Sequence, residues 1–328
     1  MTIIEELSEY RELFERSYPR YLTGRTPEIH YKIMIELMER GGKRLRPVLS
    51  MLSTELVGGR VEDVIPVAVA LELFHNSTLL HDDIEDDSML RRGKPTMHRI
   101  YGMPLALNAG DGLYGLSYEI LLECRAIHGL ERSWKIFSSF ARMHVALVEG
   151  QAMDISFRSQ PEIDEAWVIE LLRKKTGALF GASAYCGAIA GGADESIASD
   201  LFKMWENVGI AFQIRDDLLN LIGEEEKYGK KIGDDISEGK PTLILMHAMK
   251  NGSNAERERI IESLNRPYNE KQIRDVIKIF EKTNAFEYAK DVADSFLREI
   301  FSIADRIPPS RERELMVKLA KYVVEREV

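Results

Sequence analysis

The sequence of 328 residues has little of what several protein classes require. Its two cysteines, Cys124 and Cys186, are too few for a disulfide scaffold and show no metal-ligand spacing. This cysteine usage fits a reduced, cytoplasmic compartment. The chain has 44 Lys and Arg against 54 Asp and Glu, a formal net charge of −10. Such a balance argues against a general nucleic-acid binder, which needs an excess of cations facing the phosphates.

Long apolar runs are also scarce. The longest uncharged stretch, residues 177–193 (GALFGASAYCGAIAGGA), is slightly short for a membrane span and is built from Gly, Ala and Ser. We interpret it as a buried helix that packs closely through its small residues, and we expect a protein that does not span a membrane. The N-terminal residues are charged and amphipathic, so a signal peptide is not expected.

Strand-like alternation and internal repeats are absent, whereas helical spacing of apolar residues runs through most of the chain. Hydrophobic residues make up 45% of the sequence, enough for a sizeable core. The segments with helical spacing are 64–80, 105–124, 134–155, 167–190, 197–221, 242–249 and 256–327. Because only short turn signals separate them, the pattern predicts an all-α chain of ten or more helices, forming a single domain over residues 1–328.

An acidic segment, HDDIEDD, ends the first of these apolar helices. In a helix Asp82 and Asp86 share a face, so they make half of an oxygen cage for a hard cation. The C-terminal end of a helix disfavours negative charge, so a purely structural role would be poorly placed there. An acidic helix end in solvent is the competing interpretation, and this segment alone does not decide between the two.

A second acidic segment, FQIRDDLLN, also follows a long apolar helix. Asp216, Asn220 and Glu224 repeat at four-residue spacing on one face, and Gln213 lies one turn earlier. Two such rows on two long helices suggest that they face each other across a cavity. That arrangement suits Mg²⁺, which takes one or two carboxylates together with substrate phosphates and water.

Basic residues gather in four short segments that contain glycine. Arg offers a bidentate fork and Lys a point charge for phosphate oxygens, and glycine lets the backbone approach a ligand. Any one segment alone indicates a solvated loop, but four of them, two close to Asp pairs, favour seats for diphosphates bridged by metal. His75, two helical turns before Asp82, is either a satisfied core histidine or a phosphate contact. The four segments are residues 41–47, 91–96, 174–177 and 229–233.

Together these segments resemble the trans-prenyl diphosphate synthase family, which includes farnesyl and geranylgeranyl diphosphate synthases. The resemblance is carried, in family order, by GGKRLRP, HNSTLLHDDIEDDSMLRRGKPT, EGQAMD, KKTGALF, FQIRDD and YGKKIGDDISEGKPT. It implies helices around a deep central cavity, usually in a homodimer. It also implies an enzyme that joins isopentenyl diphosphate head-to-tail to an allylic prenyl diphosphate, through an allylic carbocation, with release of diphosphate.

The resemblance implies a role for each matching residue. Three Mg²⁺ ions would bridge the allylic diphosphate to two aspartate motifs, formed by Asp82, Asp83 and Asp86 and by Asp216 and Asp217. The residues implied to hold isopentenyl diphosphate are Lys43, Arg46, His75 and Arg92. Those implied to hold the allylic diphosphate are Arg91, Lys175, Lys230 and Lys240, with Lys231 able to share the part of Lys230. Those implied to lie beside the allylic cation are Thr176 and Gln213.

One position departs from the family pattern. The second motif usually reads DDxxD, and its fifth position here is Asn220, a poorer ligand for a hard cation. We expect Asp216 to carry most of the metal, and whether Asp217 or Asn220 also binds it stays open. The spacing also echoes a metal motif of terpene cyclases, but a cyclase has no use for a second diphosphate site around Lys43. A non-catalytic synthase subunit typically loses the Asp motifs, which this chain keeps.

Helix geometry suggests a product length. In this family an aromatic residue four or five positions before the first Asp stops chain growth, and here these positions are Thr78 and Ser77. The next bulky residue is Phe74, about 12 Å below Asp82 at about 1.5 Å per residue, a depth for about three isoprene units. A farnesyl primer would fit and react once more, so geranylgeranyl diphosphate is the expected main product. Longer and shorter products are the alternatives, and the preferred primer and pathway stay open.

Overall fold

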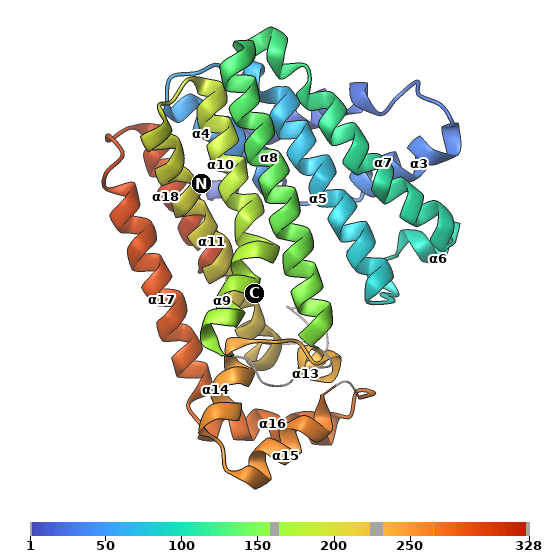
Figure 1. Ribbon diagram of the computed structural model, residues 1–328, viewed down its shortest axis with the longest axis vertical. Coiled ribbons are helices and arrows are strands. Elements are labelled where there is room, and N and C mark those ends of the chain that lie inside the picture. Colours follow the sequence, from blue (N-terminus) through green and yellow to red (C-terminus); the bar gives the residue numbers. More distant parts are fainter. Residues whose placement is uncertain (1, 158–163, 224–231, 265, 326–328) are drawn as a thin grey trace. The chain divides into compact units, whose positions relative to one another are not determined.

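The computed structural model describes residues 2–157, 164–223, 232–264 and 266–325 (Figure 1). Over these residues the regular structure is helical apart from one antiparallel hairpin, in which β1 (Leu90–Arg91) pairs with β2 (Lys94–Pro95). The predicted all-α fold is therefore confirmed. The hairpin turns through Arg92 and Gly93, both with positive φ (53° and 73°). A two-residue turn with positive φ at both central residues matches the right-handed twist of the two strands that it joins.

The helices carry the labels of Figure 1. In chain order they are α1 (Ile3–Glu6), α2 (Ser8–Ser17), α3 (Glu28–Glu39), α4 (Leu45–Leu56), α5 (Ile65–Glu85), α6 (Met97–Tyr101), α7 (Met103–Leu121), α8 (Cys124–Phe157), α9 (Glu165–Leu172), α10 (Ala178–Gly191), α11 (Glu195–Ile222), α13 (Asp234–Glu238), α14 (Leu243–Asn251), α15 (Asn254–Ser263), α16 (Glu270–Lys282), α17 (Ala285–Ala304) and α18 (Arg311–Val324). Two 3₁₀ turns lie at Tyr18–Tyr21 and Val61–Val64, and a π-helical turn lies at Arg173–Gly177.

The chain forms two compact units that interleave in sequence. Unit 1 comprises Met1–Ala141, Ser183–Leu201 and Ser310–Met316. Unit 2 comprises Arg142–Ala182, Phe202–Pro309 and Val317–Val328. Helices α8, α10, α11 and α18 contribute residues to both units, so no linker in the sequence separates them. That the two units make one domain stays a prediction.

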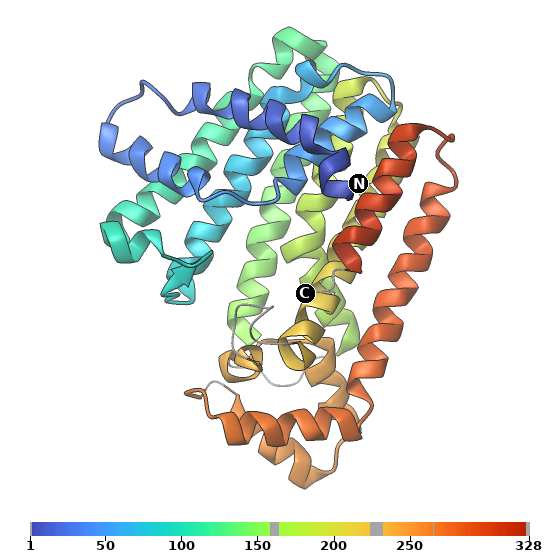
Figure 2. The same cartoon turned by 180° about the vertical axis from the view of Figure 1, so that it is seen from behind.

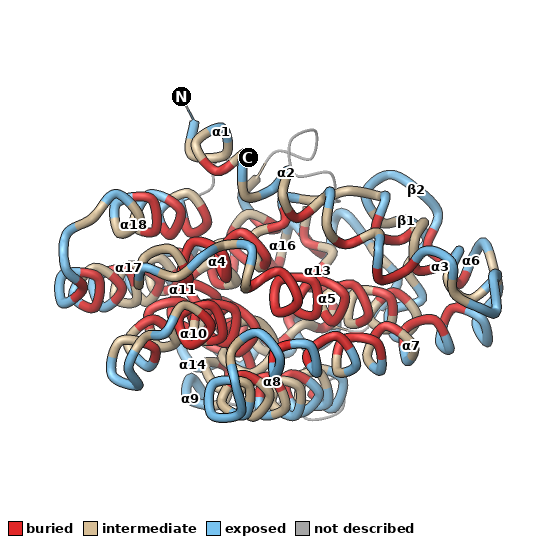
Figure 3. Tube along the Cα trace, turned by 90° about the horizontal axis from the view of Figure 1, so that it is seen from above, coloured by how far each residue is buried: buried red, intermediate tan, exposed pale blue. Residues whose placement is uncertain are grey.

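Unit 1 is built around α5, which packs against α4 and α7. Pro66 occupies the first turn of α5, where a missing backbone N–H does no harm. The helix is buried along most of its length (Figure 3). The stretch Val61–Glu85 is long and apolar enough to cross a membrane, but 78% of its most apolar window is buried inside the protein. Such burial is typical of a core helix, and α5 serves as one here.

The uncharged stretch at 177–193 contains all of α10, whose residues after Ala182 belong to unit 1. A Cβ on Gly187 would lie 2.1 Å from the carbonyl oxygen of Ser50 in α4, and one on Gly191 would lie 2.5 Å from Val57. Only residues without a side chain allow this approach. The interpretation as a buried helix packed through small residues is confirmed.

Unit 2 has its own apolar core, to which α11, α14, α16 and α17 contribute. Helix α14 contacts α15, α16 and α17, and both views show α14, α15 and α16 gathered beside α17 (Figures 1 and 2). The C-terminal half of α11 lies in this unit and presents Ile210, Ile214 and Leu218 to the core at four-residue spacing. This spacing leaves Gln213 and Asp216 on the other side of the helix, where both are half-buried.

Candidate functional site

The first acidic segment closes α5 in unit 1. Asp82 is half-buried and Asp86, the C-cap, is exposed, so the two carboxylates predicted to share a face both reach the surface. Asp83 points elsewhere: it is only 3% exposed, and its Oδ1 accepts a hydrogen bond from Arg91 Nε at 2.6 Å. Burial raises the pKa of Asp83, and the Arg91 charge opposes that shift. Arg91 Nη2 also lies 3.9 Å from Asp82, so the hairpin places one guanidinium beside both carboxylates.

The residues expected to bind isopentenyl diphosphate meet in part. Burial lowers the pKa of Arg46 to about 10, with Glu72 raising it and Arg92 lowering it. Burial also holds the pKa of His75 well below 6.5, reinforced by the charges of Arg46, Arg92, Arg91 and Arg44. His75 is therefore neutral at pH 7 inside a group of arginines. Such a cluster favours an anion.

Two glycines give the hairpin its place against the loop before α4. Arg92 Nη1 donates a hydrogen bond to the carbonyl oxygen of Gly41. Gly42 has φ 140°, and a Cβ there would lie 2.9 Å from Arg92 Nη2. Gly41 and Gly42 both have positive φ (80° and 140°), which residues with a side chain rarely adopt, so the backbone conformation explains the Gly-Gly pair in GGKRLRP. Lys43, which follows, is exposed on the same loop.

The residues proposed to control product length also lie in unit 1. Phe74 is fully buried, with ring centroids 5.1 Å from Tyr114 of α7 and 5.3 Å from Phe140 of α8. Ser77 is buried and Thr78 half-buried, and each hydroxyl donates to a carbonyl oxygen three residues earlier in α5. Sequence reasoning missed Tyr114, although its position in an apolar helical segment made it a candidate for the same core.

The second acidic segment lies on α11 in unit 2. Asp216 is half-buried, whereas Asp217 is 6% exposed and accepts a hydrogen bond from Gln213 Nε2 at 3.1 Å. Burial and the charge of Asp235 raise the pKa of Asp217 well above 3.8, against the opposing effects of Gln213 and Lys240. Lys240 Nζ lies 2.6 Å from Asp235 Oδ1, so this half-buried lysine pairs with one buried carboxylate while its charge also acts on the other, Asp217.

Asn220 is fully buried and takes part in a turn. Its Oδ1 accepts a hydrogen bond from the backbone N–H of Asp235 at 3.3 Å, and its carbonyl oxygen accepts one from the N–H of Gly233 at 2.9 Å. The carboxamide therefore holds the start of α13, which carries Asp235. Glu224, Lys230 and Lys231, which the sequence also marks, lie outside the described residues.

Lys175 and Thr176 sit in the π-helical turn that joins α9 to α10. Thr176 Oγ1 donates to Gln213 Oε1 at 3.3 Å, so the two residues expected beside the allylic cation are in contact. Lys175 Nζ donates to Asp154, which belongs to the EGQAMD segment of α8. A Cβ on Gly150 of that segment would lie 2.6 Å from the backbone nitrogen of Lys175. Isolated π turns often occur at functional sites.

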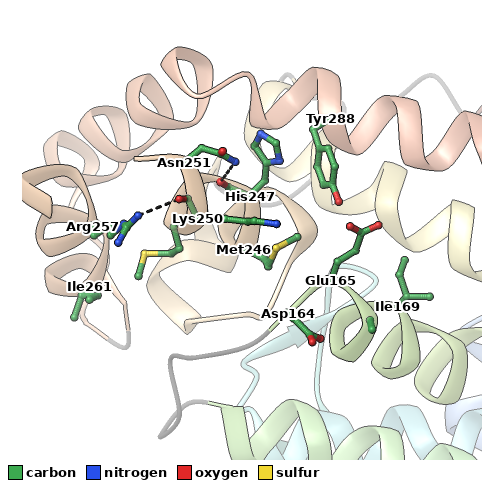
Figure 4. Close-up of a pocket in the computed structure, with 12 residues that line it drawn as sticks. Asp164, Glu165, Ile169, Met246, His247, Lys250, Asn251, Arg257, Ile261 and Tyr288 are labelled. Atoms are coloured by element: carbon green, nitrogen blue, oxygen red, sulfur yellow. Dashed lines mark hydrogen bonds between the residues drawn. The ribbon is translucent and has the colours of Figure 1, made fainter. Parts of the chain in front are cut away.

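A groove of about 1150 Å³ opens in unit 2 away from these residues (Figure 4). Helices α9, α14, α15 and α17 line it, and the His247 ring stacks on Tyr288 with centroids 4.1 Å apart. Arg257 and Lys250 lie on one side, and Asp164 and Glu165 on the other (Figure 4). Because its lining mixes both signs of charge, the groove indicates no ligand of a single charge.

Comparison with known proteins agrees with this geometry. The sequence model of the polyprenyl synthetase family matches residues 27–281. A short chain isoprenyl diphosphate synthase of Methanothermobacter thermautotrophicus is 36% identical over 100% of this chain and 99% of its own. A geranylgeranyl pyrophosphate synthase of Geoglobus acetivorans is 38% identical over 99% of each chain. The crystal structure of geranylgeranyl pyrophosphate synthetase from Pyrococcus horikoshii superposes with a TM-score of 0.93 at 35% identity, covering 99% of this chain and 98% of that one.

The fold and these matches define a prenyltransferase with an all-α fold. The chain belongs to the polyprenyl synthetase family, whose reaction is prenyl chain elongation. The resemblance found in the sequence is confirmed, and so is the enzyme class. The roles of individual residues stay predictions.

Proposed function

We propose that this prenyltransferase makes geranylgeranyl diphosphate as its main product from isopentenyl diphosphate and an allylic diphosphate. The observation that carries the proposal is the basic cluster of unit 1, in which the positive charges of Arg46 and Arg92 act on a buried, neutral His75. A second diphosphate site of this kind distinguishes chain elongation from cyclisation of a single allylic diphosphate, the main competing reaction.

In the reaction the bond between C1 of the allylic substrate and its diphosphate oxygen breaks, and the diphosphate keeps the electron pair. The double bond of isopentenyl diphosphate then attacks the allylic cation to form the new carbon–carbon bond. A proton leaves the isopentenyl unit and passes to the released diphosphate. The protein contributes positioning and electrostatics rather than a nucleophile.

Several side chains of unit 2 suit the allylic half of this reaction. Lys175 and Lys240 are proposed to hold the leaving diphosphate. Gln213 accepts a hydrogen bond from Thr176, which orients its carboxamide, and the two oxygens would stabilise the adjacent cation. Lys240 carries a pKa raised well above 10.5 by Asp235, against the effect of burial, so it stays charged throughout the working pH range.

In unit 1 the proposed donors to isopentenyl diphosphate are Lys43, Arg46, Arg92 and His75. The two arginines supply charge-assisted hydrogen bonds. His75, neutral because of its depressed pKa, would donate a ring N–H without adding a fourth positive charge. A neutral imidazole close to the arginines avoids the charge repulsion that a protonated imidazole would add.

We also propose Mg²⁺ as the cofactor, with three ions per active site. The described residues hold no ready-made cluster of three or more His, Cys, Asp or Glu side chains. Asp82 and Asp86, both at the surface on one helical face, nevertheless suit a cation that takes one or two carboxylates and completes its shell with phosphates and water. When bound, Mg²⁺ would neutralise charge on the leaving diphosphate. Asp216 is the proposed ligand from unit 2.

A homodimer is the proposed assembly. Unit 1 exposes apolar side chains one helical turn apart on two consecutive helices: Met103 and Leu107 of α7, and Leu130 and Trp134 of α8, each 46–71% exposed. A second copy of the chain would cover these side chains symmetrically. Light scattering of the purified protein measures the mass. We further propose a cytoplasmic location, supported by two cysteines that are both free and buried.

Product length tests the proposal most directly. Wild-type protein with isopentenyl diphosphate and a farnesyl primer should give mainly the four-unit product. Phe74→Ala opens the aromatic layer that Phe74 forms with Tyr114 and Phe140, and should lengthen the product by one or more units. Ser77→Phe places a ring one turn closer to Asp82 and should shorten the product toward farnesyl diphosphate. If neither substitution moves the product distribution, the floor is not in this aromatic layer.

A further inference from the structure

We infer that a buried ion pair between Arg44 and Glu72 positions the basic residues that take isopentenyl diphosphate. Neither residue is among the proposed substrate contacts. The inference rests on the proposed isopentenyl diphosphate site and adds the positioning residues beneath it. It comes from three observations in unit 1: the backbone of Arg44, the contacts of its guanidinium and the place of Glu72 on α5.

Arg44 stands between Lys43 and Arg46 in the chain, and its side chain turns away from solvent. Its backbone is left-handed (φ 51°, ψ 37°), which residues with a Cβ rarely adopt. Lys43 is exposed, whereas the Arg44 side chain is only 1% exposed. The turn therefore sends two consecutive basic residues in opposite directions, one toward solvent and one into unit 1. Such a conformation persists only where other contacts hold it.

The guanidinium of Arg44 is held at all three nitrogens. Nε donates to Glu15 at 2.8 Å, Nη1 donates to Glu72 at 3.0 Å, and Nη2 donates to the carbonyl oxygen of Met38 at 2.6 Å. The rings of Phe14 and Tyr18 lie 5.5 and 5.9 Å from its central carbon. Through these contacts Arg44, the residue before α4, is bound to α2, to α5 and to the C-terminal end of α3. Arg44 thus fixes the loop that carries Lys43 and the first turn that carries Arg46.

Glu72 is the other half of the pair and connects it to the cluster. It is 2% exposed, in the middle of an apolar helix, and it lies one turn before His75. Its Oε1 accepts from Arg44 and, at 3.4 Å, from Asn76 Nδ2. Its negative charge also raises the pKa of both Arg46 and Arg92, which burial otherwise lowers. The negative charge of Glu72 therefore helps to keep Arg46 and Arg92, two proposed phosphate ligands, positively charged.

An ion pair between Arg44 and Glu72 suits the positioning of substrate-binding arginines better than a purely structural role, in which the pair would only hold α4 against α5. Apolar side chains of similar volume would join two buried helices at least as well, because a buried ion pair is weak support for stability. An anion below a group of arginines does what apolar residues cannot: it keeps the guanidinium groups charged and directed before the substrate arrives. The substrate diphosphate then meets a preformed site.

Glu72→Gln tests the inference because it removes the charge and keeps the shape. The KM for isopentenyl diphosphate should rise about tenfold, with the KM for the allylic substrate changed less than about twofold. The matched control is Glu55→Gln, on α4 in the same unit, whose carboxylate accepts a hydrogen bond from Tyr10 of α2. It makes the same chemical change away from the cluster and should leave both KM values near those of the wild type.

The pH dependence provides a second readout that a structural role would not move. Arg46 is cationic below its pKa of about 10, and loss of the negative charge on Glu72 lowers that pKa further. In Glu72→Gln the KM for isopentenyl diphosphate should therefore begin to rise at a lower pH than in the wild type. If Glu72→Gln fails to fold, Arg44→Lys keeps the charge, removes the fork of donors and should raise the same KM.

Arg46→Ala separates this inference from the function on which it rests. If Arg46→Ala leaves the KM for isopentenyl diphosphate unchanged, the proposed substrate site is wrong and the inference falls with it. If Arg46→Ala raises that KM while Glu72→Gln and Arg44→Lys both behave like Glu55→Gln, the site stands and the inference alone is overturned. Equal damage to both KM values in Glu72→Gln would also overturn it.

Discussion

The two Asp-Asp pairs, Asp82-Asp83 and Asp216-Asp217, are identical in sequence but differ in their surroundings. At the end of α5 in unit 1, Asp82 is half-buried and Asp83 is buried against a full positive charge on Arg91. On α11 in unit 2, Asp216 is half-buried and Asp217 is buried against the neutral carboxamide of Gln213. In each pair the first carboxylate faces out and the second faces in, as neighbours on a helix do.

The difference lies in how each inner carboxylate is compensated. Asp83 has its own cation within hydrogen-bond distance, which opposes the effect of burial on its pKa. Asp217 depends on Lys240, which is already paired with Asp235, and its pKa is raised well above 3.8. Sequence position thus separates outer from inner residues in both pairs, while the neighbours of each inner residue decide whether its charge is stabilised.

The largest effect should come from the outer residues, where the comparison predicts equal behaviour. Asp82→Asn and Asp216→Asn each remove a proposed metal ligand and should lower kcat at least about a thousandfold with the fold intact. Chelator should abolish wild-type turnover, and added Mg²⁺ should restore it. Asp87→Asn is the matched control, since this exposed acid beside the first motif pairs with Arg99 at 2.6 Å and should change kcat less than about threefold.

Full activity of Asp82→Asn or of Asp216→Asn would contradict the metal assignment for the motif that carries the substitution. Full activity of the wild type in excess chelator would contradict the metal assignment for both motifs. A large loss in one motif and a small one in the other would break the symmetry of the comparison. Circular dichroism of each variant shows whether the helices have survived.

At the first motif helical periodicity alone selects the outer residues, Asp82 and Asp86. At the second motif the same spacing groups the half-buried Asp216 with Asn220, which is fully buried. The four-residue spacing of Asp82 and Asp86 needs no tertiary structure, and neither does the all-α pattern. The partners of the inner residues depend on tertiary contacts. Nothing in the sequence shows that the hairpin turns Arg91 onto Asp83.

Buried polar residues inside apolar helices were the missed signal. Glu72 interrupts an otherwise apolar run, and Arg44 lies between Lys43 and Arg46, the two basic residues of this segment that the family resemblance marks. A charged residue seldom stays buried without a partner, so each implies the other in principle. Which acid meets which base is set by the left-handed turn at Arg44, and no residue pattern marks that turn.

The inner residues should differ in stability, and this sharpens the comparison. In chelator at pH 7, Asp83→Asn removes the carboxylate that accepts the hydrogen bond of Arg91, leaving this guanidinium only Asp82 at 3.9 Å, and should lower the free energy of unfolding by about 2 kcal/mol. Asp217→Asn removes a buried charge that lies beside Asp235, keeps an oxygen that accepts from Gln213, and should change stability by less than about 0.5 kcal/mol or raise it. Urea unfolding followed by circular dichroism measures both. Equal destabilisation by the two substitutions would show that Arg91 contributes nothing that Gln213 does not.

The smallest effect concerns Asn220, where the second motif departs from its usual last letter. Asn220→Asp restores DDxxD in sequence, but the side chain is fully buried and its oxygen caps the N–H of Asp235. An aspartate keeps an oxygen for that hydrogen bond, yet it would bury another carboxyl group close to the Asp235 backbone, on the helix that already carries the buried Asp217. We therefore expect a loss of about 1 kcal/mol in the free energy of unfolding and no gain in Mg²⁺ affinity.

Two measurements check the Asn220 prediction: urea unfolding in chelator, and the Mg²⁺ concentration that gives half-maximal activity. Asn220→Ala serves as the control, since it removes the cap without adding charge and should destabilise by a similar amount. If Asn220→Asp instead lowers the Mg²⁺ requirement, the side chain reaches the metal in the active enzyme. The second motif would then have three ligand positions, and Asn220 would be a weakened ligand rather than a cap.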